Sequence, residues 1–397
     1  MKMVSIEDGC VVVTDGTHYT PPDVGEGVPF LTVKDMSDRG LDFTGCSYIT
    51  LDEYIKADLG NSSPKIGDVL FSKDGTVGKV HVVSENQEFA VLSSIAILRP
   101  RLEVLDSQYF GHILRSSFTL DQAIRRKTGS AIRRIILKDL KQVQIPLPPL
   151  EEQRRIAAIL DKADAVRRKR QSAIALTEEL LRSLFLEMFG TSVAKSWEMA
   201  TVEQLLASKT GAIRTGPFGS QLLHSEFVDR GIAVLGIDNV VKNQFQWVQL
   251  RFISEKKYEQ LKRYTVSPGD VLISIMGTCG RCAIVPDDCP KAINTKHLCS
   301  ITLNRNKCYP EFLQSYFLIH PQASNYLKKN AKGAIMEGLN MSIIKDLPVP
   351  LVPIELQKQY INLQYQILSS KASAIESKHE ADNLLNSLLQ RAFRGEL

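Results

Sequence analysis

The stretch PLPPLEEQRRIAAILDKADAVRRKRQSAIALTEELLRSLFLEMFG, residues 146–190, decides the fold of this chain. After its opening prolines it contains neither proline nor glycine until Gly190, and apolar residues recur three or four positions apart. This spacing predicts one amphipathic helix of about 40 residues and about 60 Å. The prolines mark its start because their fixed φ suits a first turn, and Gly190 provides a stop.

The same pattern occurs again at the C-terminus. The segment PLVPIELQ, residues 350–357, repeats the opening 204 positions later, and Leu181 then matches Leu385 in register. A single helix cannot bury so long an apolar stripe, so we expect the two helices to pack on each other as an antiparallel pair. Two unrelated amphipathic helices are the alternative, and the shared opening and fixed offset argue against it.

The segments that precede the two helices also resemble each other. GVPFLTV at 27–33 returns as GIAVLGI at 231–237, and the GDVL and GTVG of 67–78 return as the GDVL and GTCG of 269–280. In both segments, short β-rich runs alternate with turns rich in Gly, Asp and Pro. The sequence therefore predicts an α+β protein with two similar mixed α/β domains.

These repeats divide the chain into four segments. We expect a first domain at 1–145, a central helical spacer at 146–190, a second domain at 191–349 and a C-terminal helical spacer at 350–397. If the helices pair antiparallel, the molecule is pseudo-twofold, with one domain at each end of the helical pair.

The composition of the sequence indicates in which cellular compartment the protein is expected and which kinds of partner it can bind. No run of 18 apolar residues and no charged-then-apolar leader occurs in the sequence, so we expect neither a membrane span nor secretion. Five of the seven cysteines lie between Cys279 and Cys308, which is not the pattern of a disulfide framework and favours a reducing cytoplasm. The net charge of +5 is compatible with a nucleic-acid partner without requiring one.

The repeats resemble the specificity subunit of type I restriction–modification systems. The residues that carry the resemblance are the two PLxPxExQ segments, RTGPFGS at 214–220, and the paired GDVL and GTxG segments. The resemblance implies two target-recognition domains that each read half of a bipartite, asymmetric DNA site. It also implies helical spacers that set the gap between the halves and dock methyltransferase subunits. The first expected strand begins within a few residues of Met1, so we expect any lead-in segment there to be short.

The same resemblance implies the partners. They are double-stranded DNA, two modification subunits that bind S-adenosylmethionine, and restriction subunits that use ATP and Mg and cut DNA. The chain itself is expected to bind no cofactor and to be non-catalytic. A specificity subunit of a related or orphan DNA-modification system is one alternative, and an enzyme with an unrecognised active site is another.

Motifs for catalysis or metal binding are missing from the sequence. Neither Pro-Pro pair lies in the Asn/Asp/Ser-Pro-Pro-aromatic motif of amino-methyltransferases, and GTVGK at 75–79 lacks the spacing of a phosphate-binding loop. Cys279-x-x-Cys282 supplies one ligand pair where a structural zinc site needs two, so we expect free thiols and no metal.

Three kinds of segment are candidates for DNA contact in each domain. They are the loop after the first strand, the GTxG turn with its neighbouring cations, and a basic loop after the domain's helices. The structural alternatives are an ordinary connecting loop, a glycine turn and a solvated charge run. The candidates are Thr17, His18, Lys73, Thr76, Lys79, Arg125, Arg126, Lys127, Ser130, Arg133 and Arg134 in the first domain, and Arg214, Phe218, Ser220, Gln221, Thr278, Arg281, Lys328, Lys329 and Lys332 in the second.

Overall fold

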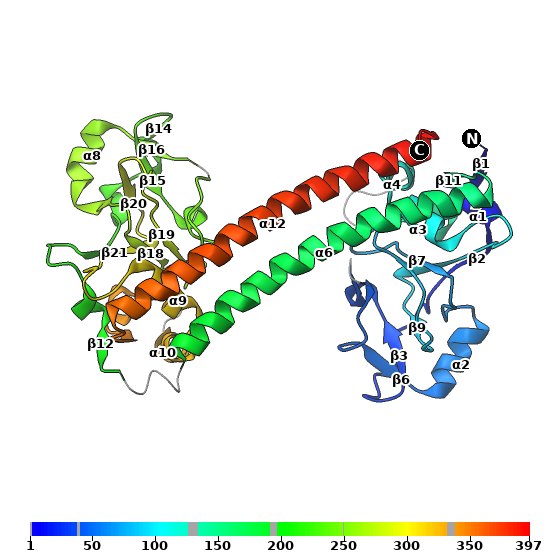
Figure 1. The fold of residues 1–397 in the computed structure, drawn as a ribbon, viewed down its shortest axis with the longest axis horizontal. Helices are drawn as coiled ribbons and strands as arrows, with labels where there is room; N and C mark the ends of the chain where they lie inside the picture. The colour runs from blue at the N-terminus through cyan, green and yellow to red at the C-terminus, as the bar shows by residue number, and fades with distance from the viewer. Residues whose placement is uncertain (1, 38–39, 126–133, 191–196, 249, 332–337) are drawn as a thin grey trace. The chain divides into compact units, whose positions relative to one another are not determined.

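The computed structural model describes residues 2–37, 40–125, 134–190, 197–248, 250–331 and 338–397 (Figure 1). Its contacts divide the chain into two compact units, one formed by Met1–Ala173 with Ser373–Leu397 and the other by Ile174–Ala372. Each unit holds one mixed α/β domain and about half of each long helix, α6 (Leu150–Phe189) and α12 (Ile354–Arg394). The predicted four-segment division stays a prediction, because the contact boundary falls inside both helices.

The first unit is built on a four-stranded antiparallel sheet. Its strand order is β2 (Cys10–Asp15), β10 (Ile95–Pro100), β7 (Val69–Ser72) and β8 (Val80–Val82). A second sheet has the order β6 (Ser47–Ile49), β3 (Val28–Leu31) and β9 (Ala90–Val91), with β3 and β9 parallel. The remaining elements are β1 (Met3–Ser5) paired with β11 (Gln144–Pro146), β4 (Met36–Ser37) paired with β5 (Gly40–Leu41), α1 (Ile6–Gly9), the 3₁₀ helix η1 (Val33–Asp35), α2 (Leu51–Leu59), α3 (Ser107–Arg115), α4 (Ser117–Arg125) and α5 (Leu137–Lys141).

The second unit repeats this layout. Its four-stranded sheet has the order β13 (Ile213–Thr215), β21 (Leu298–Ile301), β18 (Val271–Ser274) and β19 (Cys282–Ile284). The second sheet has the order β14 (Phe227–Val228), β16 (Phe252–Ile253), β15 (Ile232–Leu235), β20 (Ala292–Asn294) and β17 (Thr265–Val266), and β15 and β20 are parallel. The remaining elements are β12 (Met199–Thr201) paired with β22 (Pro348–Pro350), η2 (Val202–Leu205), η3 (Gly219–Gln221), η4 (His224–Glu226), η5 (Ile237–Asn239), α8 (Glu255–Leu261), η6 (Lys262–Tyr264), α9 (Pro310–Ile319), α10 (Pro321–Ala331) and α11 (Met341–Lys345).

The central strand β7 explains how each domain packs. All four of its residues are buried, because both faces of the sheet are covered. Val69 and Phe71 point into the core that holds α3, whereas Leu70 points into the core under the second sheet. Strand β18 alternates in the same way, with Leu272 facing the second sheet. The repeated GDVL segment is therefore the centre of each domain.

The repeated opening of each long helix is fixed by a buried glutamine. The Gln153 Oε1 accepts from the Asp106 N–H at 2.8 Å, and its Nε2 donates to the Val104 and Pro148 carbonyls. In the second unit the Gln357 Oε1 accepts from the Tyr309 N–H at 2.9 Å. The Gln357 Nε2 donates to the Lys307 and Val352 carbonyls. Each PLxPxExQ segment thus ends on a side chain that ties the helix to its own domain.

The two long helices run antiparallel, as predicted. In the first unit, Ile156 and Leu160 of α6 share a core with Leu389 and Phe393 of α12. In the second unit, the Phe185 ring of α6 lies 5.3 Å from the Tyr360 ring of α12. The start of each helix therefore packs near the end of the other, and the α+β class with paired helices is confirmed.

The pairing leaves part of the predicted apolar stripe in solvent. Exposed apolar residues along the two helices are Val166, Leu176, Leu180, Leu363, Ile375 and Leu384. The expectation that the helices bury each other's whole stripe was therefore too strong. Within the residues that the structure describes, no helix is long and apolar enough to cross a membrane.

Candidate nucleic-acid interface

The GTxG turn is a rigid platform in both domains. The Ser72 Oγ donates to the Thr76 carbonyl at 2.6 Å and accepts from the Lys79 N–H at 2.7 Å. The Ser274 Oγ makes the same two contacts with the Thr278 carbonyl and the Arg281 N–H. The turn glycines have φ between 67° and 98°, a region that residues with a Cβ rarely adopt. The exposed tips of the turns are therefore held in one conformation.

The end of the basic loop returns to this turn. The Ile135 N–H donates to the Lys73 carbonyl at 2.8 Å, and the Leu339 N–H donates to the Ile275 carbonyl at 3.0 Å. The Arg134 Nε lies 3.5 Å from a carboxylate oxygen of Asp74 in the first turn. The end of the basic loop therefore lies beside the GTxG turn in both domains, and in the first domain it brings Arg134 there.

Most of the basic-loop candidates cannot be placed. Lys328 and Lys329 are exposed on the last turn of α10. Arg126, Lys127, Ser130, Arg133 and Lys332 lie outside the described residues, as does the side chain of Arg125.

The loop after the first strand joins the same edge through close backbone packing. The Thr17 N–H donates to the Val91 carbonyl, and the Ser93 N–H donates to the Thr17 carbonyl, both at 2.9 Å. A Cβ on Gly16 would lie 2.0 Å from the Val91 carbonyl oxygen, so only glycine fits there. Gly216 packs in the same way against the backbone of residues 294–295.

The segment that follows this contact leads to the turn. The Lys73 N–H donates to the Ser94 carbonyl, and the Ile275 N–H donates to the His297 carbonyl, both at 2.9 Å. The first loop, the GTxG turn and the end of the basic loop, which are far apart in the sequence, thus meet along one edge of each domain.

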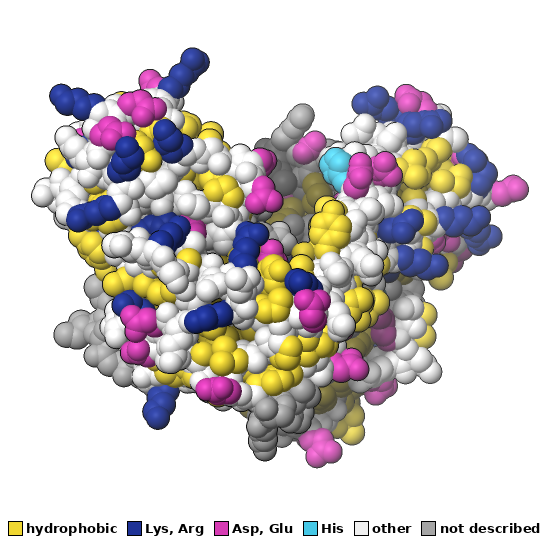
Figure 2. Space-filling model, turned by 60° about the vertical axis from the view of Figure 1, so that its left-hand side comes forward, with side chains coloured by type: hydrophobic (Ala, Val, Ile, Leu, Met, Phe, Trp, Pro, Cys, Tyr) yellow, Lys and Arg dark blue, Asp and Glu magenta, His cyan; other side chains and the backbone are white. Residues whose placement is uncertain are grey.

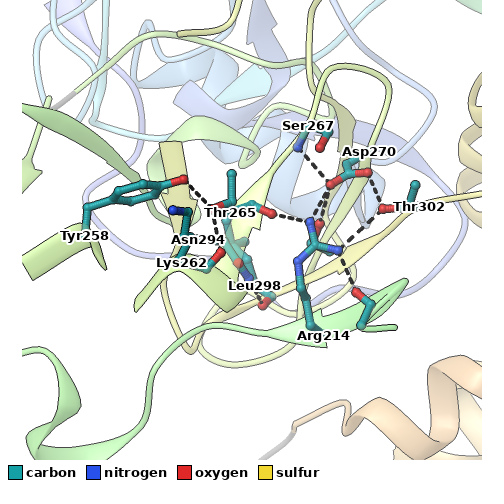
Figure 3. A network of polar contacts seen from close by, with 11 residues as sticks. Arg214, Tyr258, Lys262, Thr265, Ser267, Asp270, Asn294, Leu298 and Thr302 are labelled. Carbon is teal, nitrogen blue, oxygen red and sulfur yellow. Dashed lines mark hydrogen bonds and ion pairs between the residues drawn. The ribbon is translucent and has the colours of Figure 1, made fainter. Parts of the chain in front are cut away.

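Two candidate cations turn out to be internal. The Lys73 side chain is 2% exposed, and its Nζ lies 2.9 Å from the Asp15 carboxylate. The Arg214 side chain is 10% exposed and pairs with Asp270 at 2.7 Å (Figure 3). From the sequence alone both residues are candidate DNA contacts, because their carboxylate partners are distant along the chain. We remove these two residues from the candidate DNA contacts.

The Asp270 network shows why Arg214 is structural. Its carboxylate accepts from Arg214, from the Ser300 hydroxyl and from the Thr302 hydroxyl. Arg214 also donates to the Thr265 carbonyl, which links the first sheet to the second (Figure 3). A buried carboxylate is stable only with such partners, so the network fixes the position of β13.

In the first domain the equivalent buried aspartate is also paired with an arginine, but this arginine comes from a different strand. Asp68, the counterpart of Asp270, accepts two hydrogen bonds of 2.8 Å from Arg99 on β10. Strand pairing places Thr14 where Arg214 stands and Arg99 where Thr302 stands. The arginine and the threonine have therefore changed strands between the two domains.

The other described candidates reach solvent to different degrees. The His18 side chain is 76% exposed and lies 3.2 Å from Asp15. Lys79 donates to the Val33 and Met36 carbonyls, so its charge sits over η1. Exposed candidates on the turns and on the second loop are Thr76, Phe218, Ser220, Gln221, Thr278 and Arg281.

Two further cations, Lys296 and Arg251, lie near His297 on this edge of the second domain, and they are not among the candidates predicted from the sequence. Burial lowers the pKa of His297, and the neighbouring charges of Lys296 and Arg251 lower it further. The signal was weak in the sequence because Arg251 directly precedes β16 and is distant along the chain from Lys296 and His297. Figure 2 shows Lys and Arg side chains interspersed with acidic ones over the face in view, so positive charge is local rather than one continuous patch.

The comparisons with known proteins decide the family. The type I restriction modification DNA specificity domain matches residues 3–176 and 226–381. The chain belongs to this family. It is thus a specificity subunit of a type I restriction–modification system, which is a non-catalytic component, as the sequence predicted.

Curated relatives and solved structures agree. The EcoBI specificity subunit of Escherichia coli is 25% identical over 75% of this chain and 68% of that protein. The putative MjaX specificity subunit of Methanocaldococcus jannaschii is 25% identical over 84% and 78%. A solved type I R-M system chain shares the fold with a TM-score of 0.59, at 19% identity over 100% of this chain and 98% of that one. The S subunit from M. genitalium gives 0.58, at 14% identity over 99% and 96%.

The specificity subunit offers no evident metal site in its described part. No group of three or more His, Cys, Asp or Glu side chains there is arranged to hold a metal ion. Burial raises the pKa of the Cys299 and Cys308 thiols to about 12. A thiol with so high a pKa is a poor metal ligand, because metals bind the thiolate.

Proposed function

We propose that this specificity subunit reads a bipartite, asymmetric DNA site, with residues 1–145 reading one half and residues 191–349 the other. The observation that carries the proposal is the duplicated edge formed by the first loop, the GTxG turn and the end of the basic loop. The scaffold is the same in both domains, whereas the exposed side chains differ. Cations and backbone N–H groups there would hold phosphates, and the loop side chains would read base edges.

The long helices would set the gap between the half-sites and dock the modification subunits. With 40 and 41 residues, α6 and α12 are each about 60 Å long. Leu180 of α6 and Leu384 of α12 occupy equivalent positions and are both exposed. An apolar side chain repeated in solvent on two helices fits a partner surface that is used twice. Two modification subunits would then bind, one on each half of the pseudo-twofold pair.

The chemistry would come from the partners. The modification subunits would supply S-adenosylmethionine and methylation, and restriction subunits would supply ATP hydrolysis with Mg and DNA cleavage, in the cytoplasm. A related or orphan DNA-modification system would use the chain in the same way.

Methylation mapping tests this function. Cells expressing the chain with its modification partner should carry methyl groups at one motif with two fixed halves and a constant gap. The purified chain alone, incubated with DNA and labelled S-adenosylmethionine, should incorporate nothing. A continuous motif, or methylation by the chain alone, would contradict the proposal.

A further inference from the structure

A polar cluster joins the candidate Gln221 of the first loop in the second domain to two residues outside the predicted segments. We name it the Arg263 cluster, and it consists of Gln221, Arg263 and Tyr264. The Tyr264 hydroxyl donates to the Gln221 Oε1 at 2.8 Å, and the Arg263 guanidinium donates to the Tyr264 hydroxyl at 2.6 Å. The guanidinium carbon also lies 4.7 Å from the centre of the Tyr264 ring. The cluster thus joins loop residue 221 to η6, which follows α8.

The cluster is anchored but remains accessible. Tyr264 and Leu222 both pack on the apolar core that contains Ile232, Val234 and Ile293 of the second sheet. Arg263 and Gln221 are exposed. A polar group that is held by packing on a sheet and open to solvent meets the requirement for preorganised recognition.

The charge of Arg263 is available to a ligand. In the part of the chain that the structure describes, no ion pair neutralises it, whereas Arg214 and Arg251 are paired with Asp270 and Asp238. Its partners in the cluster are a neutral hydroxyl and a neutral amide. The remaining guanidinium N–H groups, with the Gln221 amide N–H groups, form a set of donors at one exposed point.

The first domain carries different chemistry at the same place. There the hydroxyl of loop residue Tyr19 donates to Glu53 of α2, and Lys56 donates to Glu53 at 2.7 Å. Lys56 and the loop residues 15–19 line a pocket of about 330 Å³. In both domains a helical element that follows a strand of the second sheet therefore reaches the first loop: α2 after β6 in the first domain, and η6 after β16 and α8 in the second. The second-domain cluster is donor-rich and cationic, whereas the first-domain cluster contains a carboxylate.

We propose, resting on the proposed function, that the Arg263 cluster is a specificity-determining site that reads a guanine in the second half-site. Guanine presents two acceptors, N7 and O6, in the major groove, and an arginine fork with two donors matches them. Stacking on Tyr264 fixes the plane of the fork. Gln221 and Tyr264 are positioning residues, since they hold Arg263 rather than supply the charge.

The test measures base preference, not only affinity. The complex with the modification partner is incubated with a DNA library in which every base pair of both half-sites is varied one at a time. For Arg263→Ala, preference for G·C over the other pairs should fall about 5- to 150-fold at one position, the range for a lost bidentate contact. Preference at every position of the first half-site should stay unchanged.

Two further variants separate reading from folding and from charge. Tyr264→Phe keeps the ring under Arg263 and loses both hydroxyl hydrogen bonds, the one donated to Gln221 and the one accepted from Arg263, so it should relax the same position partially and leave thermal unfolding unchanged. Lys262→Ala removes the adjacent exposed cation, which pairs with Glu259, and should change no preference.

Other outcomes would overturn the site. A uniform loss of affinity over all sequences, with a shallower salt dependence, would assign Arg263 to a phosphate. Unchanged preference at all positions would remove the cluster from the interface. Absence of any sequence preference in the complex that carries no substitution would instead refute the proposed function itself.

Discussion

Single buried polar side chains hold each domain to its long helix. Gln153 and Gln357 each pair with one backbone N–H and two carbonyls, and both are fully buried. Their amides supply both a donor and an acceptor, which no apolar side chain of similar size can do. The glutamine of the PLxPxExQ segment is therefore required by the fold rather than by contact with DNA.

Replacing Gln153 by Met should destabilise the first domain. Each buried backbone group left without a partner costs about 1–3 kcal/mol, so the urea unfolding midpoint should fall clearly. Gln142→Met, at an exposed position after α5, is the matched control and should change stability by less than about 0.5 kcal/mol. Equal midpoints for both variants would show that the three hydrogen bonds do not matter.

The stability of the second domain should depend on pH through His320. Its Nε2 donates to the Phe189 carbonyl at 3.0 Å while its Nδ1 accepts from the Gln322 N–H at 3.2 Å, so the imidazole is neutral in the folded domain. Burial lowers its pKa. The unfolded chain therefore binds the proton more tightly, and stability should fall as pH drops below about 6.5 toward the lower folded value.

Unfolding midpoints at pH 7.5 and 5.5 check this sign. The loss between the two pH values should be smaller in His320→Gln, which cannot titrate. An equal loss in both proteins would place the pH dependence on other groups.

The parts of the candidate site that could be predicted from the sequence are those in which the interacting residues lie within one short segment. The GTxG turns follow from glycines within a few residues of the serine that caps them. Lys73 and Arg214 were misjudged because Asp15 and Asp270 lie 58 and 56 positions away, and a sequence does not show which charges fold together. Arg263 and Tyr264 were missed for the same reason, since they contact Gln221 from another element.

Helices α6 and α12 combine an internal face and an external face. The predicted length of about 40 residues agrees with the 40 residues of α6, because prolines at its start and a glycine at its end are strong local signals. The extent of mutual burial could not be predicted, because an apolar stripe does not reveal whether its cover is the neighbouring helix or another protein. Leu181 and Leu385 are half-buried in their own units, whereas Leu180 and Leu384 are 52% and 55% exposed.

Adjacent leucines should therefore respond differently to a charge. Changing Leu180 and Leu384 together to Asp should leave unfolding nearly unchanged and abolish binding of the modification subunit, measured by co-purification. Changing Leu181 and Leu385 together to Asp should cost several kcal/mol of stability, since it desolvates carboxylates and loses apolar burial. Normal assembly of the Leu180 and Leu384 variant would move the docking surface elsewhere.

At the scale of the whole molecule, the repeat predicts that each domain reads a different half-site. Two domains of one fold differ in the loops that the proposal assigns to base reading, Thr17-His18-Tyr19 against Pro217-Phe218-Gly219. The two half-sites should therefore differ in sequence. The fold of each domain was predictable from the repeat, whereas the bases were not, because readout depends on side-chain geometry and hydration.

The helical spacer should act as a ruler. Inserting four residues within α6, ahead of its end at Phe189, adds about one helical turn, roughly 6 Å, which corresponds to one or two base pairs at about 3.4 Å each. The methylated motif should then keep both halves and gain that spacing. A four-residue insertion at the exposed turn of residues 287–288 is the control and should leave the gap as it was. A variant that reads new bases at the old spacing would refute the ruler.

The exchange of arginine and threonine between the two sheets limits how such genes can recombine. A crossover between β2 and β10 that joined the two repeats would give a daughter domain with two threonines around its buried aspartate, or one with two arginines. The first leaves a buried anion without a cation and the second crowds two cations, so neither daughter should fold. A crossover in the PLxPxExQ segments separates no such pair. New specificities in this lineage should therefore arise by shuffling whole domains at those segments, and genes spliced within a sheet should be lost.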